Sequence, residues 1–182
     1  MKILFLGPQG SGKSTQAKLV AQKLDLPYIE MGQLLREKSN GSDTQAGEIR
    51  QALEVGDLVP DAITIKTLQE RLAKSDCKNG FVLDGYPRNY AQVEGLPSGI
   101  DRVFYFKISD EEAVKRLIDR GRHDDTLEVI SRRLELFHRE SEPLLTYFRQ
   151  QGIIAEIDGS QSINQIQEEI AGIIQNENDQ NK

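Results

Sequence analysis

A glycine-rich segment at residues 7–14, GPQGSGKS, has the residue types and spacing of a phosphate-binding loop. Its glycines let successive backbone N–H groups converge on phosphate oxygens, and a following helix N-terminus adds a favourable dipole. Lys13 would reach the β- and γ-phosphates of a nucleotide, and the Ser14 hydroxyl stands where a magnesium ligand is expected. An apolar run at 3–6 and a helix-like stretch at 15–24 flank the loop. This context predicts a nucleoside triphosphate site rather than an ordinary glycine-rich turn.

A second segment that could do chemistry is FVLDGYPR at residues 81–88, where an apolar strand runs into a polar turn. Asp84 would lie at the carboxyl edge of the sheet beside the phosphate loop, where ligands bind in open α/β sheets. There it could hold magnesium through water, while Arg88 could grip a phosphate with two hydrogen bonds. Taken singly, Asp84 could cap a turn and Arg88 could be a solvated charge. Their place after a phosphate loop favours the functional interpretation.

A basic segment occupies residues 115–126, KRLIDRGRHDDT. Arg116 and Arg120 are four residues apart and share a helix face, where like charges repel unless an anion lies between them. Gly121 is predicted to stop this helix. Three further arginines extend the cluster: Arg122, Arg132 and Arg133. We therefore favour an anion-binding cluster over a solvated helix face.

Two aspartates end the basic segment. Asp124 could orient the arginine cluster or a magnesium-bound water. Asp125 and Glu128 have the spacing of a capping box for the next helix, worth about 1 kcal/mol, which gives Asp125 a purely structural alternative. The predicted buried stripe of that helix is Leu127, Ile130, Leu134 and Phe137.

Short apolar runs alternate with longer amphipathic ones, as in a parallel sheet covered by helices. We predict strands at 2–6, 27–30, 80–84, 102–107 and 153–157. We predict helices near 14–24, 32–39, 44–55, 61–74, 89–95, 110–120, 127–140, 143–151 and 162–175. Pro143 should kink or restart the long segment after 127, and the polar tail 176–182 should fray. The excursion at 31–59 is interpreted as a helical flap over a ligand site, with a packing insertion as the alternative.

Composition limits the class of protein. The 182 residues fit a single domain, and a net charge of −6 argues against a nucleic-acid partner held by a general basic surface. The single cysteine, Cys77, excludes an internal disulfide and a multi-cysteine zinc site, and His123 and His138 are too isolated to suggest a metal. Neither a targeting signal nor an apolar run of about 20 residues is present. We expect a cytoplasmic protein with no membrane contact.

In their order along the chain, the phosphate loop, DGYPR at 84–88, RGRHDD at 120–125 and Arg133 resemble the motifs of adenylate kinases. The segments VGDLVP at 55–60 and DGS at 158–160 are similar to further family segments, so the resemblance covers nearly the whole chain. It implies a P-loop three-layer α/β/α fold with a five-stranded parallel sheet, a monophosphate-binding flap at 31–59 and a very short lid at 120–126. The implied reaction converts ATP and AMP into two ADP with magnesium. We expect no zinc, because the loop at Gly121 is so short and Cys77 stands alone, and nothing in the sequence requires more than a monomer.

The resemblance also implies roles for individual residues. Those placed around ATP are Gly10, Ser11, Gly12, Lys13, Ser14, Thr15, Arg116 (against the adenine) and Arg120. Those placed around AMP are Gly32, Arg36, Val59, Gly85, Arg88, Gln92 (at the adenine edge), Arg122 and Arg133. The implied catalytic residues are Lys13, Arg88, Arg120, Arg122, Arg133 and Asp124, and the implied magnesium residues are Ser14 and Asp84, partly through water.

The chain departs from the family pattern at several positions. Ser14 replaces the usual Gly and could contact the metal more directly. Met31 replaces Thr and Gln33 replaces Asp, which weakens or replaces a contact to the acceptor adenine. Gly121 alone separates two arginines, so almost no lid remains between them.

Three alternatives stay open at this point. The first is a small-molecule kinase of related fold, acting for example on shikimate or gluconate. The second is a nucleotide-dependent switch that turns over poorly. The third is a monophosphate kinase of relaxed acceptor specificity, or one that prefers CMP or UMP. Phosphate transfer from ATP to a panel of monophosphates separates them.

Overall fold

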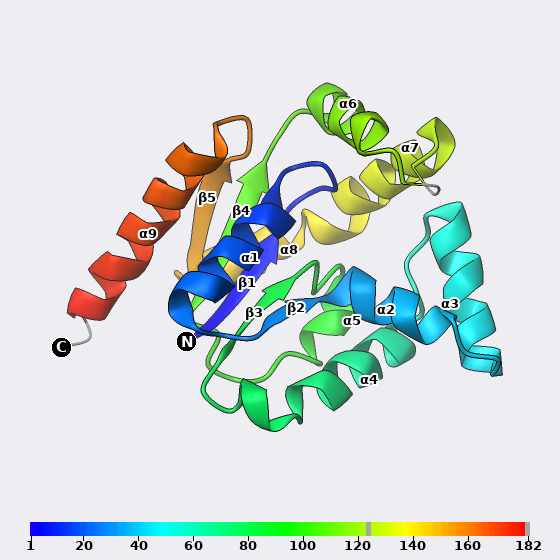
Figure 1. Cartoon of the computed structure of the whole chain (residues 1–182), viewed down its shortest axis with the longest axis horizontal. Coiled ribbons are helices and arrows are strands. Elements are labelled where there is room, and N and C mark those ends of the chain that lie inside the picture. The colour runs from blue at the N-terminus through cyan, green and yellow to red at the C-terminus, as the bar shows by residue number, and fades with distance from the viewer. Residues whose placement is uncertain (123–124, 181–182) are drawn as a thin grey trace.

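One parallel β-sheet organises the computed structural model, which describes residues 1–122 and 125–180. Within these residues five strands lie in the spatial order β2–β3–β1–β4–β5, and every neighbouring pair is parallel. The strands are β1 (Lys2–Leu6), β2 (Tyr28–Glu30), β3 (Phe81–Asp84), β4 (Arg102–Lys107) and β5 (Ile154–Asp158). Helices flank the sheet on both sides (Figure 1), which confirms the predicted three-layer α/β/α architecture.

The helices lie between the strands along the chain and after the last strand. They are α1 (Lys13–Leu24), α2 (Met31–Ser39), α3 (Thr44–Val55), α4 (Asp61–Leu72), α5 (Tyr90–Val93), α6 (Asp110–Arg120), α7 (Leu127–Leu136), α8 (Leu144–Gln150) and α9 (Ile163–Gln180). A 3₁₀ turn covers Ser75–Cys77, and a π-helical turn over Phe137–Ser141 follows α7. The chain restarts as α8 after Pro143, as predicted. Among the described helices, none is both long and apolar enough to cross a membrane.

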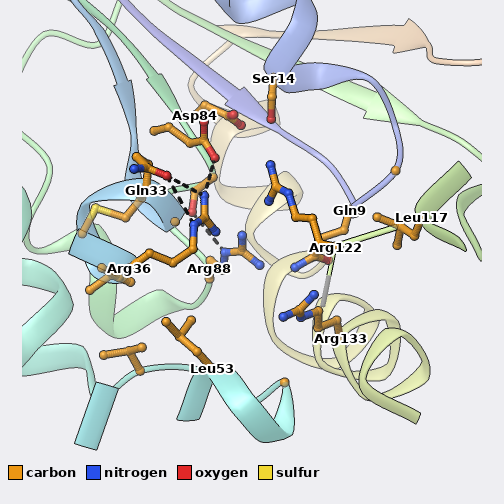
Figure 2. A pocket seen from close by; sticks show the side chains of 18 of the residues that line it. Gln9, Ser14, Gln33, Arg36, Leu53, Asp84, Arg88, Leu117, Arg122 and Arg133 are labelled. Carbon is orange, nitrogen blue, oxygen red and sulfur yellow. Dashed lines mark hydrogen bonds and ion pairs between the residues drawn. The ribbon is translucent and has the colours of Figure 1, made fainter. Parts of the chain in front are cut away.

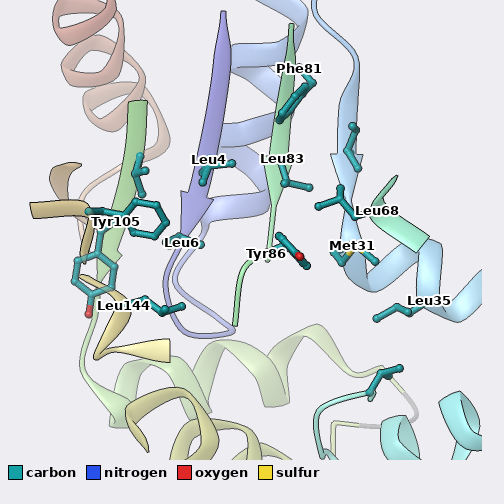
Figure 3. Close-up of a cluster of buried hydrophobic side chains, with 14 of the residues drawn as sticks. Leu4, Leu6, Met31, Leu35, Leu68, Phe81, Leu83, Tyr86, Tyr105 and Leu144 are labelled. Atoms are coloured by element: carbon teal, nitrogen blue, oxygen red, sulfur yellow. The ribbon is translucent and has the colours of Figure 1, made fainter. Parts of the chain in front are cut away.

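Side chains of β1 alternate between the two faces of the sheet, as a strand requires. Leu4 and Leu6 pack on one face, while Ile3 and Phe5 pack on the other. Because both faces are covered, the strand is apolar throughout rather than alternating in polarity. Helices α1 and α9 cover the Ile3 face, and the opposite face packs on residues of α2, α3, α4 and α8 (Figure 3). This central strand delivers the chain to the phosphate loop.

Helices α6 and α7 share a separate small cluster of buried residues: Ala113, Leu117, Ile130 and Leu134. The predicted stripe of α7 was wrong at Leu127, which is 62% exposed because it begins the helix, whereas Val129 is buried. The capping-box prediction for Asp125 and Glu128 was also wrong. Thr126 is the N-cap, and its Oγ1 accepts from the backbone N–H of Val129 at 3.3 Å. The helix therefore starts one residue later than a cap at 125 would place it, and the Asp125 carboxylate is free for other contacts.

The insertion between β2 and β3 contains α2 and α3, which pack on each other. Its far end approaches α7, where Asp57 Oδ1 accepts from Arg132 Nε at 2.7 Å. In Figure 1 this pair of helices projects away from the sheet toward α7.

The C-terminal helix is longer than predicted. Helix α9 runs to Gln180, five residues beyond the expected end near 175, so the backbone of 176–180 is helical. Ile166, Ile170 and Ile174 anchor its earlier turns on the sheet. No Pro or Gly follows Ile174 to end the helix, so it continues into the polar sequence.

Candidate active site

The phosphate loop adopts a conformation that depends on glycine. Gly7 and Gly10 have φ angles of +143° and +85°. A Cβ at Gly10 would lie 2.7 Å from the carbonyl oxygen of Ala113, and one at Gly7 would lie 2.7 Å from that of Phe106. A side chain at either position would therefore be both strained and too close to backbone. The loop leads directly into α1, whose N-cap is Gly12.

Lys13 is buried at the start of α1, and its Nζ donates to the loop's own Pro8 carbonyl at 2.9 Å. The pKa of Lys13 is lowered from 10.5 to about 8, chiefly by burial, and the positive charges of Arg88 and Arg120 contribute in the same direction. The negative charges of Asp84 and Glu30 raise the pKa of Lys13 and so offset part of this decrease. The ammonium is thus held in a cationic, poorly solvated place, where a bound anion would stabilise its charged form.

A single cavity of about 1320 Å³ opens between the phosphate loop, the α2–α3 insertion and the α6–α7 pair. The predicted site residues that line it are Gly10, Gly12, Lys13, Ser14, Thr15, Gly32, Arg36, Val59, Asp84, Gly85, Arg88, Gln92, Arg116, Arg120, Arg122 and Arg133. Ser11 does not line it, because its side chain is fully buried. Asp124 and His123 lie outside the described residues. In Figure 2, Arg36 and Arg88 lie on one wall, and Arg122 and Arg133 lie on the opposite wall.

Asp84 and Ser14 both line this cavity (Figure 2). Asp84 is only 2% exposed, and its Oδ2 accepts from the Tyr28 hydroxyl at 2.9 Å. Its Oδ1 is buried without a hydrogen-bond partner, which is uncommon for a buried carboxylate oxygen. Within the described ranges, no group of three or more His, Cys, Asp or Glu side chains could hold a metal. A carboxylate, a hydroxyl and room for phosphates nonetheless fit hydrated Mg²⁺, which keeps several waters in proteins.

Two arginines on the β3 side of the cavity are held by neighbouring groups. Arg36 Nη2 donates to Glu30 Oε1 at 2.8 Å and to Gln33 Oε1 at 3.3 Å. Arg88 Nε donates to the Gly85 carbonyl at 3.1 Å. Burial is the main cause that lowers the pKa of Arg88. The negative charge of Asp84 raises this pKa in part, while nearby cations, including Arg36, lower it. An anion between these guanidiniums would relieve their mutual repulsion.

Gln92 is buried at the base of the same wall with both ends of its amide bonded. Its Oε1 accepts from the Arg88 backbone N–H at 2.8 Å, and its Nε2 donates to Asp61 Oδ1 at 2.9 Å. These contacts fix the orientation of the amide and leave one N–H and one lone pair for a ligand. Met31 also lines the cavity, and only 2% of it is exposed.

Asp125 organises the opposite wall, a role that the sequence analysis missed. Its carboxylate is fully buried and accepts two hydrogen bonds from Arg120, at 2.7 and 2.9 Å. It also accepts from Arg133 Nη1 at 3.3 Å and from the Arg122 backbone N–H at 3.3 Å. The available signal was an acidic residue in the short loop between two arginine-bearing helices, with Arg120 and Arg122 before it and Arg133 after it.

Arg116 is held beside the phosphate loop. Its Nε donates to Glu112 Oε1 at 2.8 Å, and its Nη1 donates to the Gly159 carbonyl at 2.9 Å. The segment around Gly159 thus fixes the guanidinium against the rim of the cavity.

The sequence matches the family profile described as Adenylate kinase over residues 5–153. Adenylate kinase from Micrococcus luteus is 38% identical over 180 aligned residues, which cover 93% of this chain and 88% of the relative. The Leptospira biflexa enzyme of the same name is 36% identical over 176 residues, covering 91% and 95% of the two chains. That of Mycobacterium sp. (strain MCS) is 38% identical over 173 residues, covering 91% and 94%.

Proposed function

Because the chain belongs to the adenylate kinase family, we propose that its cavity positions ATP and AMP for direct phosphate transfer between them. The enzyme moves the γ-phosphate of ATP to AMP and gives two ADP. The family assignment does not favour a small-molecule kinase, a nucleotide switch or a pyrimidine-preferring kinase. One observation supports the residue roles: seven cationic side chains with proposed roles, from well-separated parts of the chain, line the same cavity. They are Lys13, Arg36, Arg88, Arg116, Arg120, Arg122 and Arg133.

On the ATP side, the backbone N–H groups of residues 10–15 would bind phosphate oxygens at the N-terminus of α1. Lys13 would leave the Pro8 carbonyl for the β- and γ-phosphates, whose charge stabilises its protonated form. Arg116, held by Glu112 and by the Gly159 carbonyl, would lie against the adenine.

On the acceptor side, Arg36 and Arg88 would bind the phosphate of AMP, while Gln92 would bind the adenine edge. Gln92 Oε1 already accepts from the backbone N–H of Arg88. The side chain proposed to bind the adenine therefore also fixes the backbone of the arginine proposed to bind the phosphate. The backbone around Gly32, Val59 and Gly85 would shape this half of the cavity.

The transfer requires no side-chain nucleophile. An oxygen of the AMP phosphate, already ionised at neutral pH, forms a bond to the γ-phosphorus of ATP. The bond from that phosphorus to the bridging oxygen breaks, and ADP is left on both sides. Arg120, Arg122 and Arg133 would neutralise the charge of the moving group. Asp125 already fixes two of these guanidiniums, so little reorganisation is needed at the moment of transfer.

We propose that Ser14 and Asp84 hold the Mg²⁺ that accompanies ATP, Asp84 through water. The unpartnered Asp84 Oδ1 supports this assignment. When bound, the ion neutralises phosphate charge and orients the β- and γ-phosphates. Asp124, outside the described residues, stays a proposed partner of the arginine cluster or of metal-bound water. We also propose that the enzyme acts as a cytoplasmic monomer, which sedimentation velocity would test for the oligomeric state.

A coupled assay of ADP formation from ATP and a panel of monophosphates tests the function. We expect the highest kcat/KM with AMP and no transfer without Mg²⁺. A higher kcat/KM with CMP or UMP would refute the adenylate assignment and leave the kinase assignment standing.

A further inference from the structure

Glu30 is a carboxylate that lies among the cationic residues proposed to bind phosphate in the cavity. It ends β2, lines the cavity, and its side chain is 19% exposed. Its backbone is in register with Asp84 at the end of β3, so two acidic residues occupy neighbouring strand ends. Like charges at such positions are destabilising, and a phosphate ligand would add to the repulsion. Glu30 therefore needs a compensating partner.

That partner is Arg36. Glu30 Oε1 accepts from Arg36 Nη2 at 2.8 Å, the short distance typical of a charge-assisted hydrogen bond. Its Oε2 lies 3.3 Å from the Tyr28 hydroxyl, which is 2.9 Å from Asp84 Oδ2. A phenol has only one proton, and the shorter distance favours Asp84. Most of the compensation for Glu30 therefore comes from Arg36.

We propose that Glu30 is a built-in counter-ion that competes with the acceptor's phosphate for Arg36 and thereby sets the affinity for AMP. The inference rests on the proposed role of Arg36 in binding that phosphate. In the nucleotide-free enzyme the carboxylate satisfies the guanidinium. When the acceptor binds, its phosphate takes Arg36, and Glu30 loses the ion pair that compensates its charge.

Gln33 would keep the Arg36 guanidinium in position during this exchange. Its Oε1 accepts from Arg36 Nε at 3.4 Å and from Nη2 at 3.3 Å (Figure 2). A neutral amide holds the guanidinium but competes with an anion less strongly than a carboxylate does. A phosphate dianion carries more charge than Glu30, so it displaces the carboxylate better than a monoanionic group of similar size.

Calorimetric titration of AMP in the absence of ATP tests the proposal. Glu30→Gln keeps the size of the side chain and removes its charge. We expect it to lower the Kd of AMP about three- to tenfold, the scale of a partly exposed ion pair. Glu48→Gln is the matched control, because Glu48 is an exposed carboxylate on α3 that does not line the cavity. It should leave the Kd unchanged, and ATP should bind both variants with wild-type affinity.

A double-mutant cycle with Arg36→Met separates competition from general charge repulsion. We expect Arg36→Met to raise the Kd of AMP at least tenfold, and Glu30→Gln to change it less than twofold in that background. If Arg36→Met alone leaves AMP binding unchanged, the acceptor role of Arg36 fails. If Arg36→Met weakens AMP, two results would overturn the Glu30 proposal. One is a Kd for Glu30→Gln that is equal to or higher than that of the wild type, and the other is the same gain from Glu30→Gln in both backgrounds.

Discussion

Replacing Lys13 by Met should abolish most activity and yet make the nucleotide-free protein more stable at neutral pH. Lysine and methionine have similar length, so the change chiefly removes a buried charge. Burial lowers the pKa of Lys13 from 10.5 to about 8, which corresponds to about 3 kcal/mol at 1.36 kcal/mol per pH unit. The variant also loses the hydrogen bond to Pro8, worth about 1 kcal/mol. We therefore expect a net gain of about 2 kcal/mol, or about 4–8 °C in Tm.

The sign of the pH dependence follows from the lowered pKa. Between pH 8 and 10.5 the unfolded chain binds a proton at this lysine that the folded protein has released, so wild-type stability rises with pH relative to the variant. The advantage of Lys13→Met is complete below about pH 8 and falls to less than half by about pH 9.5. Urea unfolding at pH 7 and pH 9.5, together with a coupled assay, measures both effects. In that assay, turnover should fall by orders of magnitude, because a positioned charge is lost from the transition state.

The control is Lys23→Met, at an exposed lysine of the same helix. It should change stability by less than about 0.5 kcal/mol and keep wild-type activity. A Lys13→Met protein that is less stable than wild type at pH 7, or whose stability difference is the same at both pH values, would refute the reasoning.

Four other outcomes follow from the site. Arg88→Ala should lower kcat about 10²–10³-fold with an unchanged circular dichroism spectrum, and wild-type turnover in the folded variant would remove Arg88 from the site. Asp125→Asn should loosen Arg120 and Arg133, so that kcat falls about 10²-fold and Tm drops; an unchanged kcat would show that these arginines need no anchor. Met31→Thr should raise the ratio of kcat/KM for AMP over CMP a few-fold, the worth of one neutral hydrogen bond, and a lower ratio would count against a base contact at this position. The very short lid expected at 120–126 should exclude water incompletely, so ATP hydrolysis without acceptor should be measurable though slower than transfer, and its absence in a fully active preparation would contradict this expectation.

Much of the fold could be predicted because its signals are local. A continuous apolar strand, a glycine-rich loop and an amphipathic helix follow one another at 2–24, and each has its own sequence pattern. The same holds for Asp84 and Arg88, whose place after an apolar strand puts them at the sheet edge. For these segments, the local sequence pattern alone predicts the element that the fold contains.

The remaining features depend on contacts between distant parts of the chain or on competition within a short loop. Tyr28 donates to Asp84 only because β2 and β3 are neighbours in register, which no local pattern specifies. Asp125 fits a capping box, but its carboxylate binds two arginines, and Thr126 caps the helix instead. The Glu30–Arg36 pair was missed for a third reason: the two residues are close in sequence, but Glu30 ends β2 and Arg36 lies in α2, so their contact depends on how the strand turns into the helix.

The position of β1 in the sheet has a consequence for folding. This strand comes first along the chain but lies at the centre, between β3 and β4. During synthesis its apolar residues stay without a strand partner until Phe81–Asp84 and Arg102–Lys107 have left the ribosome. Such long-range pairing slows folding and leaves an aggregation-prone strand exposed in the meantime. A nascent chain that ends before β4 would thus contain the entire phosphate-loop sequence but lack one of the two strands that hold β1 in the sheet.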